Sequence, residues 1–137
     1  MAYPNDSTTL ELPLPARRHS TLGLVLVRRV AAHGLRDARA AMLALDAAGP
    51  NFRKLLVLVR ALVVDLARTS RRKIVLAPCC AAGMTRDEGL LMAMIAGEGL
   101  AVHAVLTDDA NCPAAMTTAH ALGEELQRIA IRNDWRR

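Results

Sequence analysis

The clearest apolar pattern of the chain lies between Pro50 and Ser70. Large apolar residues recur there at steps of three and four positions, which is the spacing of one face of an α-helix. Arg53, Arg60 and Arg68 fall off this face. The pattern predicts a helix with one side in the core. Its apolar face consists of Phe52, Leu55, Leu56, Val59, Leu62, Val63 and Leu66.

Two shorter helices are predicted before it. The first begins at Ser20 or Thr21 and ends near His33, because Gly34 is a common residue type directly after a helix. The second covers about residues 36–47 and is followed by a Gly-Pro pair. The expected inward faces are Leu22, Val25, Leu26, Arg29 and Val30 in the first helix, and Leu35, Ala38, Met42 and Leu45 in the second.

A fourth helix is predicted from a capping box. Thr85 precedes Glu88 by three residues, so the threonine hydroxyl and the glutamate carboxylate can each accept a backbone N–H of the first turn. Before it, the apolar residues 74–77 form a short extended segment that ends at Pro78. The inward residues of this helix are Leu90, Leu91, Met94 and Ile95.

The last helix is expected from Pro113 to about Arg132, since proline suits the first position of a helix. Residues 100–106 fit a strand by their alternation and a helix by their alanine content, so both remain open. The inward residues of the last helix are Met116, Ala119, Leu122, Leu126 and Ile129.

Composition agrees with a helical fold. Apolar residues make up 53% of the chain and aromatics only 2%, so the core is aliphatic, and its alanine and leucine are strong helix formers. We predict a mainly α protein: a compact bundle of four to six helices with one short extended segment near 74–77. Pro4, Pro13 and Pro15 oppose helix in residues 1–19, which we assign to a flexible N-terminal tail. Residues 20–137 form a single helical domain.

Positive charge is concentrated in the first half of the chain. Residues 17–73 carry 13 basic and 3 acidic side chains, whereas residues 74–137 carry 5 basic and 8 acidic ones. A basic patch at the end of the third helix could bind phosphate or nucleic acid, but a helix C-terminus also favours cations. With three aromatic residues, stacking on single-stranded nucleic acid is disfavoured. The patch consists of Arg68, Arg71, Arg72 and Lys73.

The chain carries no membrane or export signal that we recognise. No uncharged apolar run reaches about 18 residues, which a membrane-spanning helix requires. Asp6 and Glu11 precede the first apolar run, which is not the pattern of a signal peptide. Three cysteines, two of them adjacent, do not make a disulfide framework. We therefore expect a basic protein of the cytoplasm with reduced thiols.

The adjacent Cys79 and Cys80 are the most distinctive chemical feature. They lie a few residues before a predicted helix N-terminus, which could lower a thiol pKa. Zn or Cu(I) could bind there if soft ligands and a histidine joined the pair. No C-x-x-C spacing is present, so we expect structural packing first, a reactive thiol second and a metal site third. The candidate thiol or ligand site is Cys79, Cys80, Met84, Cys112 and His33, with His103 and His120 as further nitrogen ligands.

Three stretches together resemble a known family: 28–38, which contains A-A-H-G-L-R-D-A, 77–80, which reads A-P-C-C, and 84–88, which reads M-T-R-D-E. The chain is similar over about residues 20 to the last helix to small uncharacterised alphaproteobacterial proteins classed as a domain of unknown function. The resemblance implies a compact, mainly helical domain, favours helix at 100–106, and implies no activity. Family members often continue the cysteine pair with Cys and Pro. Ala81 and Ala82 stand there in this chain, which argues against a metal cluster.

These observations favour a cytosolic regulatory or protein-interaction module that binds an unknown protein partner, or a second copy as a homo-oligomer, through a helix face. The alternative is a thiol-dependent redox or metal-binding protein centred on Cys79 and Cys80. A nucleic-acid-associated basic domain is the weaker alternative. The chain contains no Walker A, G-x-S-x-G or H-E-x-x-H motif. We therefore assign no catalytic residue and no cofactor, and do not predict an enzyme.

Overall fold

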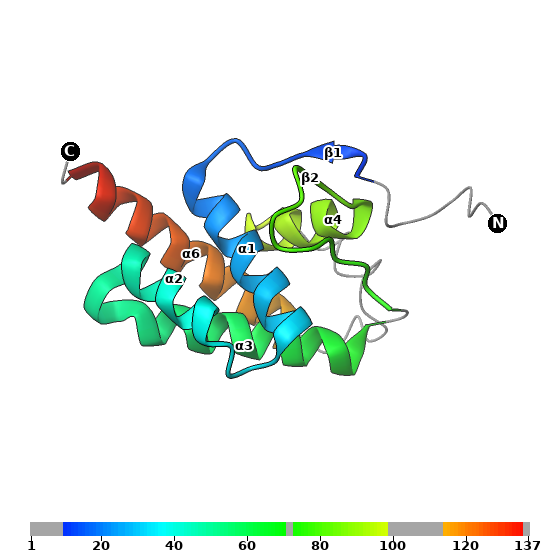
Figure 1. The fold of residues 1–137 in the computed structure, drawn as a ribbon, viewed down its shortest axis with the longest axis horizontal. Helices are drawn as coiled ribbons and strands as arrows, with labels where there is room; N and C mark the ends of the chain where they lie inside the picture. The colour runs from blue at the N-terminus through cyan, green and yellow to red at the C-terminus, as the bar shows by residue number, and fades with distance from the viewer. Residues whose placement is uncertain (1–9, 71–72, 99–113, 136–137) are drawn as a thin grey trace.

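The structure is a computed structural model that describes residues 10–70, 73–98 and 114–135. It is mainly helical with one small sheet, as the sequence predicts (Figure 1). A short 3₁₀ turn at Gly49–Asn51 joins α2 to α3. The helices are α1 (Arg18–His33), α2 (Ala38–Ala48), α3 (Phe52–Thr69), α4 (Arg86–Ile95) and α6 (Ala114–Trp135), and the strands are β1 (Leu12–Pro13) and β2 (Gly83–Met84).

The core lies where α1, α3 and α6 meet. Figure 1 shows α3 along one side of the molecule with α1 and α6 inclined to it, and each of the three contacts the other two. The expected apolar face of α3 is confirmed, because its buried residues are Leu55, Leu56, Val59, Leu62 and Leu66. Among the described residues of α6, Ala115, Ala119, Leu122, Leu126 and Ile129 are buried.

The end of α1 is as predicted, and its buried side is wider than predicted. Gly34 follows the helix with φ +99°, a conformation that glycine adopts without a Cβ clash. Leu26 and Val30 of the predicted face are buried, but so are Leu24, Val27 and Arg28 outside it, whereas Val25 and Arg29 are only half-buried. The reason is that α1 contacts α2, α3, α4 and α6 and is therefore covered on more than one side.

The predicted inward face of α2 is wrong. The helix packs through Ala40, Ala44 and Ala48, which are buried at a spacing of four residues. Met42 and Leu45 are 65% and 48% exposed, and Leu35 in the preceding turn is 44% exposed. Alanines allow two helices to approach closely, and they repeat with helical spacing just as the larger residues do. Helical periodicity alone therefore does not distinguish the alanine face of α2 from the face that carries the larger apolar residues.

The predicted capping box at the start of α4 is confirmed. The Glu88 amide donates to Thr85 Oγ1 (3.1 Å), and the Thr85 amide donates to Glu88 Oε1 (2.9 Å). Residues at the start of α4 also form hydrogen bonds with the predicted extended segment 74–77, which is neither helix nor strand. The amide of Val75 donates to Asp87 Oδ2 (2.8 Å), and Thr85 Oγ1 donates to the Val75 carbonyl (2.8 Å). Side chains therefore replace the strand partner that this segment lacks.

The N-terminal segment contributes a strand. Leu12–Pro13, which the sequence analysis assigns to the tail 1–19, pair antiparallel with Gly83–Met84, with Leu12 opposite Met84. Residues 100–106, whose structure was left open between strand and helix, lie outside the described residues. Within the part of the chain that is described, no helix is long and apolar enough to cross a membrane.

Candidate functional site

Arg28 anchors the loop that carries the two cysteines. Its side chain is buried in α1 and reaches across to the end of the loop. Nη2 donates to the carbonyl oxygen of Gly83 (2.7 Å) and Nη1 to that of Ala81 (3.4 Å). Nε and Nη2 also donate to the two carboxylate oxygens of Glu88 at 2.6 and 2.8 Å. One guanidinium thus joins α1, α4 and the cysteine loop.

Glu88 is held as a charged carboxylate in the interior. Burial alone would raise its pKa, but hydrogen bonds from Arg28 and from the amides of Thr85 and Ala77 outweigh burial and lower the pKa. The Ala77 amide lies 3.0 Å from Glu88 Oε2. Both ends of the segment from Ala77 to Gly83 are therefore tied to the same ion pair.

Arg29, the next residue of α1, is partly buried and contacts the first cysteine. Its Nε and Nη2 donate to the two carboxylate oxygens of Asp37, each at 3.0 Å. Its Nη1 lies 3.8 Å from the Sγ of Cys79. Asp37 is itself positioned as the N-cap of α2, because its Oδ2 accepts the amide of Ala40 at 3.0 Å. The guanidinium beside Cys79 is therefore fixed by two helices.

Cys79 is half-buried and Cys80 is exposed. The hydrogen bond from Arg29 lowers the pKa of the Cys79 thiol; partial burial opposes this, while Arg39 and Cys80 add to it. The sequence offered the N-terminus of α4 as a group that could lower this pKa. In the structure, the Glu88 and Thr85 side chains accept the amides of Thr85 and Glu88 at the start of that helix, and the cation in contact with the thiol comes from α1.

Three of the other predicted ligands, Met84, His33 and His120, lie in the described parts of the chain. Met84 is buried in β2, and His33 is exposed at the end of α1. His120 is on α6, where its Nε2 lies 2.9 Å from Glu124 Oε1. Cys112 and His103 lie outside the described residues. Within the described ranges, no three His, Cys, Asp or Glu side chains form a group that could hold a metal ion.

The predicted basic patch is described only in part. Arg68 is exposed in the last turn of α3, and Lys73 is exposed beyond it. Arg71 and Arg72 lie outside the described residues. Whether the four cations form one surface therefore remains a prediction.

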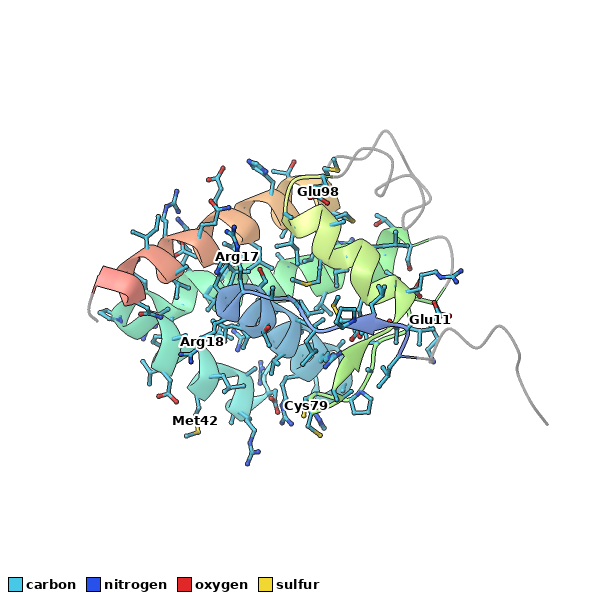
Figure 2. The ribbon with its side chains drawn as sticks, turned by 90° about the horizontal axis from the view of Figure 1, so that it is seen from above. Glu11, Arg17, Arg18, Met42, Cys79 and Glu98 are labelled. Carbon is cyan, nitrogen blue, oxygen red and sulfur yellow. The ribbon has the colours of Figure 1, made fainter. Side chains whose placement is uncertain are left out.

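A second surface of note is the outer side of α2, which we call the α2 face. Met42 and Leu45 lie on it with Ala38, and Leu35 stands beside it in the turn before the helix. Figure 2 shows Met42 pointing away from the body of the molecule, on the same side as Cys79. The α2 face is the side of the helix that the packing through alanines leaves exposed.

Sequence reasoning missed the roles of Arg28 and Arg29. A signal for them was present, because both interrupt the apolar run from Leu22 to Val30. An arginine in such a run must be buried with a partner or reach around the helix to water. Neither partner, Glu88 nor Asp37, follows from helical spacing.

The chain is similar to one protein family over its full length. The model of a family of unknown function, DUF6628, matches residues 1–137. The chain belongs to this family. The DUF6628 match agrees with the domain of unknown function that the motifs suggested and includes residues 1–19, which that resemblance left out. No curated protein and no solved structure matches the chain.

Proposed function

We propose that this member of DUF6628 is a regulatory or protein-interaction module that docks through the α2 face. The observation that carries the proposal is the inverted packing of α2, whose alanines face the core while Met42 and Leu45 face solvent. Scattered exposed apolar residues are ordinary, but a contiguous apolar surface is typical of an interaction site. Ala38, Met42 and Leu45 recur at steps of four and three, the spacing of a helix–helix contact.

The partner that this surface fits is a second copy of the same chain. Arg39 and Asp46 are both exposed and lie seven residues apart, each one position after an apolar residue of the α2 face. Seven residues are almost two full helical turns, so both charges flank the same side of the apolar row. If two α2 helices pair antiparallel about Met42, each Arg39 lies opposite the Asp46 of the other copy. Charges beside such a seam set its orientation.

The size of the surface sets the expected strength. A helix of 11 residues is about 16 Å long, so a contact between two such helices belongs to the small, transient class of interfaces. We therefore expect self-association at high micromolar concentration rather than an obligate dimer.

Sedimentation velocity over a concentration series tests this proposal. The wild-type chain should shift from monomer to dimer as concentration rises, and Met42→Asp should remain monomeric because it places a charge in the seam. Val57→Asp is the matched control, since Val57 is 59% exposed on α3, outside the α2 face. Wild-type protein that stays monomeric at the highest concentration contradicts the proposal.

Charge exchange tests the antiparallel geometry. Arg39→Asp and Asp46→Arg should each weaken the dimer, because each places like charges opposite one another. The double variant restores opposite charges and should dimerise like the wild type. If both single variants weaken the dimer and the double variant does not restore it, the antiparallel pairing is contradicted.

Binding of nucleic acid is the less favoured proposal. It rests on the basic patch, of which Arg68 and Lys73 are described, and it predicts an affinity that falls steeply with salt. We also propose a cytoplasmic location, supported by the odd number of cysteines, which does not suit a disulfide framework. Fractionation of cells that express a tagged chain tests the location.

A further inference from the structure

The region around Cys79 contains a cluster of charged and nucleophilic groups from three parts of the chain. Arg29 comes from α1, Asp37 and Arg39 come from the start of α2, and Cys80 adjoins Cys79 in the loop. We propose that Cys79 is a site of reversible thiol–disulfide exchange with small disulfides that carry carboxylate groups. This inference goes beyond the interaction role and shares only Arg39 with the proposed α2 seam.

The first support is the fixed position of the cation beside the sulfur. Arg29 Nη1 lies 3.8 Å from Cys79 Sγ, while the other two nitrogens of the guanidinium are bonded to Asp37. Because Asp37 also caps α2, the cation is held in place before any reaction. A guanidinium held at this distance favours the thiolate, which is the nucleophile in disulfide exchange.

The charges around the site favour the same form of the sulfur. Arg29 and Arg39 lower the pKa of Cys79, and the adjacent Cys80 contributes a hydrogen bond in the same direction. Asp37 is the acidic group of the cluster; its charge is matched by its two bonds to Arg29, and His33 also acts on it. The two arginines therefore place a positive field on Cys79, which Asp37 reduces.

The second support is accessibility in a rigid setting. Cys80 is exposed and Cys79 is half-buried, so a small molecule can reach the pair from solvent. Arg28 bonds the carbonyls of Ala81 and Gly83, and Glu88 bonds the amide of Ala77, so both ends of the loop are anchored. The sulfur is thus presented by a held loop rather than buried as packing.

The positive field also selects the type of disulfide. Arg29 and Arg39 both act on Cys79, and the salt bridge to Asp37 neutralises only one of them. A disulfide that bears carboxylates is attracted to such a surface, whereas an uncharged disulfide is not. Oxidised glutathione is the natural probe of this chemical class, and it is the probe we choose.

The reaction is an exchange without any further oxidant. The Cys79 thiolate attacks one sulfur of the small disulfide, a new S–S bond forms, and the original S–S bond breaks. The departing sulfur takes the electron pair and then a proton from water. Cys79 is oxidised to a mixed disulfide, and the departing thiol is the reduced product. Excess small thiol reverses the step by attack on the new bond.

The test follows adduct formation by mass spectrometry with peptide mapping, using the full chain and oxidised glutathione at neutral pH. We expect the adduct on Cys79 first, severalfold faster than on an unstructured peptide of the same loop sequence. Cys80→Ser should retain the rate and Cys79→Ser should lose it. An adduct that forms first on Cys80 or Cys112 overturns the proposal.

Variants of Arg29 test whether its charge, rather than its contribution to folding, controls the reactivity of Cys79. Arg29→Gln should slow the reaction severalfold and move the rate–pH profile to higher pH, whereas Arg29→Lys keeps a cation and should recover part of the rate. Both variants are first checked for wild-type helicity. If Arg29→Gln unfolds the chain, the wild-type protein alone provides the test. At low salt it should react faster with oxidised glutathione than with bis(2-hydroxyethyl) disulfide, and this difference in rate should shrink as the salt concentration rises. Equal rates for the two disulfides at low salt, or an Arg29→Gln profile that matches the wild type, overturn the proposal.

Discussion

Arg28 and Glu88 form a bidentate ion pair in the interior of the protein. The pair joins Nε to Oε2 at 2.6 Å and Nη2 to Oε1 at 2.8 Å, and the two side chains are 1% and 0% exposed. The residues are 60 positions apart, so the pair connects α1 to α4 across the fold. Arg28 also bonds the Gly83 carbonyl of β2, which pairs with β1. One contact thus organises this side of the molecule.

Removing one partner of this pair should be strongly destabilising. Arg28→Met leaves the Glu88 carboxylate buried without its counter-charge, and losses of about 3–5 kcal/mol in the free energy of unfolding are typical of such changes. Urea denaturation measures the loss. The matched control is Arg86→Ala, which breaks a surface pair with Glu11 (3.3 Å) and should cost less than about 1 kcal/mol. Similar losses in both variants would contradict the structural role of Arg28.

The same pair predicts how stability depends on pH. The folded protein lowers the pKa of Glu88, so the folded state binds fewer protons than the unfolded state as the pH decreases. The stabilisation is therefore complete above the ordinary glutamate pKa of about 4.3 and is lost as the pH falls through the lower folded value. Urea unfolding between neutral and acid pH should show this decline. Glu88→Gln cannot titrate at this position, so its stability should fall less steeply over the same range.

The parts of the fold that follow from neighbouring residues were predictable, and the parts that depend on distant ones were not. The α3 stripe and the Thr85–Glu88 capping box are set within a few positions of the chain, and both are confirmed. The α2 face was misassigned because two faces share helical spacing, and the choice between them depends on how closely α2 can approach α3. The pairing of Leu12–Pro13 with Gly83–Met84 has no local signal.

The candidate site shows the same division. The adjacent cysteines were evident from the sequence, but the group that acts on them was not. Arg29 is near Asp37 in sequence and 50 residues from Cys79, and only the packing of α1 against the loop brings them together. Electrostatic environments of this kind depend on tertiary contacts, so residue spacing alone did not identify Arg29.

Substitutions to alanine should destabilise the protein in the core but not on the α2 face. Leu62 is fully buried in α3, so Leu62→Ala should cost about 2–5 kcal/mol through lost burial and the cavity that remains. Met42→Ala removes an exposed side chain and should change stability by less than about 0.5 kcal/mol. Urea unfolding at low protein concentration, where the chain is monomeric, gives both values. A large loss for Met42→Ala would mean that this residue supports the monomer.

Thr85 should be sensitive to loss of its hydroxyl but not of its methyl group. Its Oγ1 accepts the Glu88 amide and donates to the Val75 carbonyl, so Thr85→Ala breaks two hydrogen bonds. Loss of an N-cap costs about 0.5–2 kcal/mol, and the second bond places this variant at the upper end of that range. Thr85→Ser keeps both bonds and should lie much closer to the wild type in thermal unfolding. Equal losses for alanine and serine would show that packing of the methyl group, not capping, matters at this position.

Gly123 should reverse the usual effect of replacing glycine in a helix. Alanine is normally favoured over glycine in a helix interior by about 1 kcal/mol. At Gly123 of α6, however, a Cβ would overlap the backbone carbonyl oxygen of Ile95 at the end of α4, and a backbone atom cannot move aside as a side chain can. Gly123→Ala should therefore destabilise by about 1–3 kcal/mol, as overpacking does.

Gly89→Ala in α4 is the matched control, because its Cβ would meet only the terminal methyl of Leu12, which can rotate away. Thermal unfolding should show a lower midpoint for Gly123→Ala and an unchanged or higher one for Gly89→Ala. A stabilised Gly123→Ala variant would mean that α4 and α6 lie further apart than this structure places them.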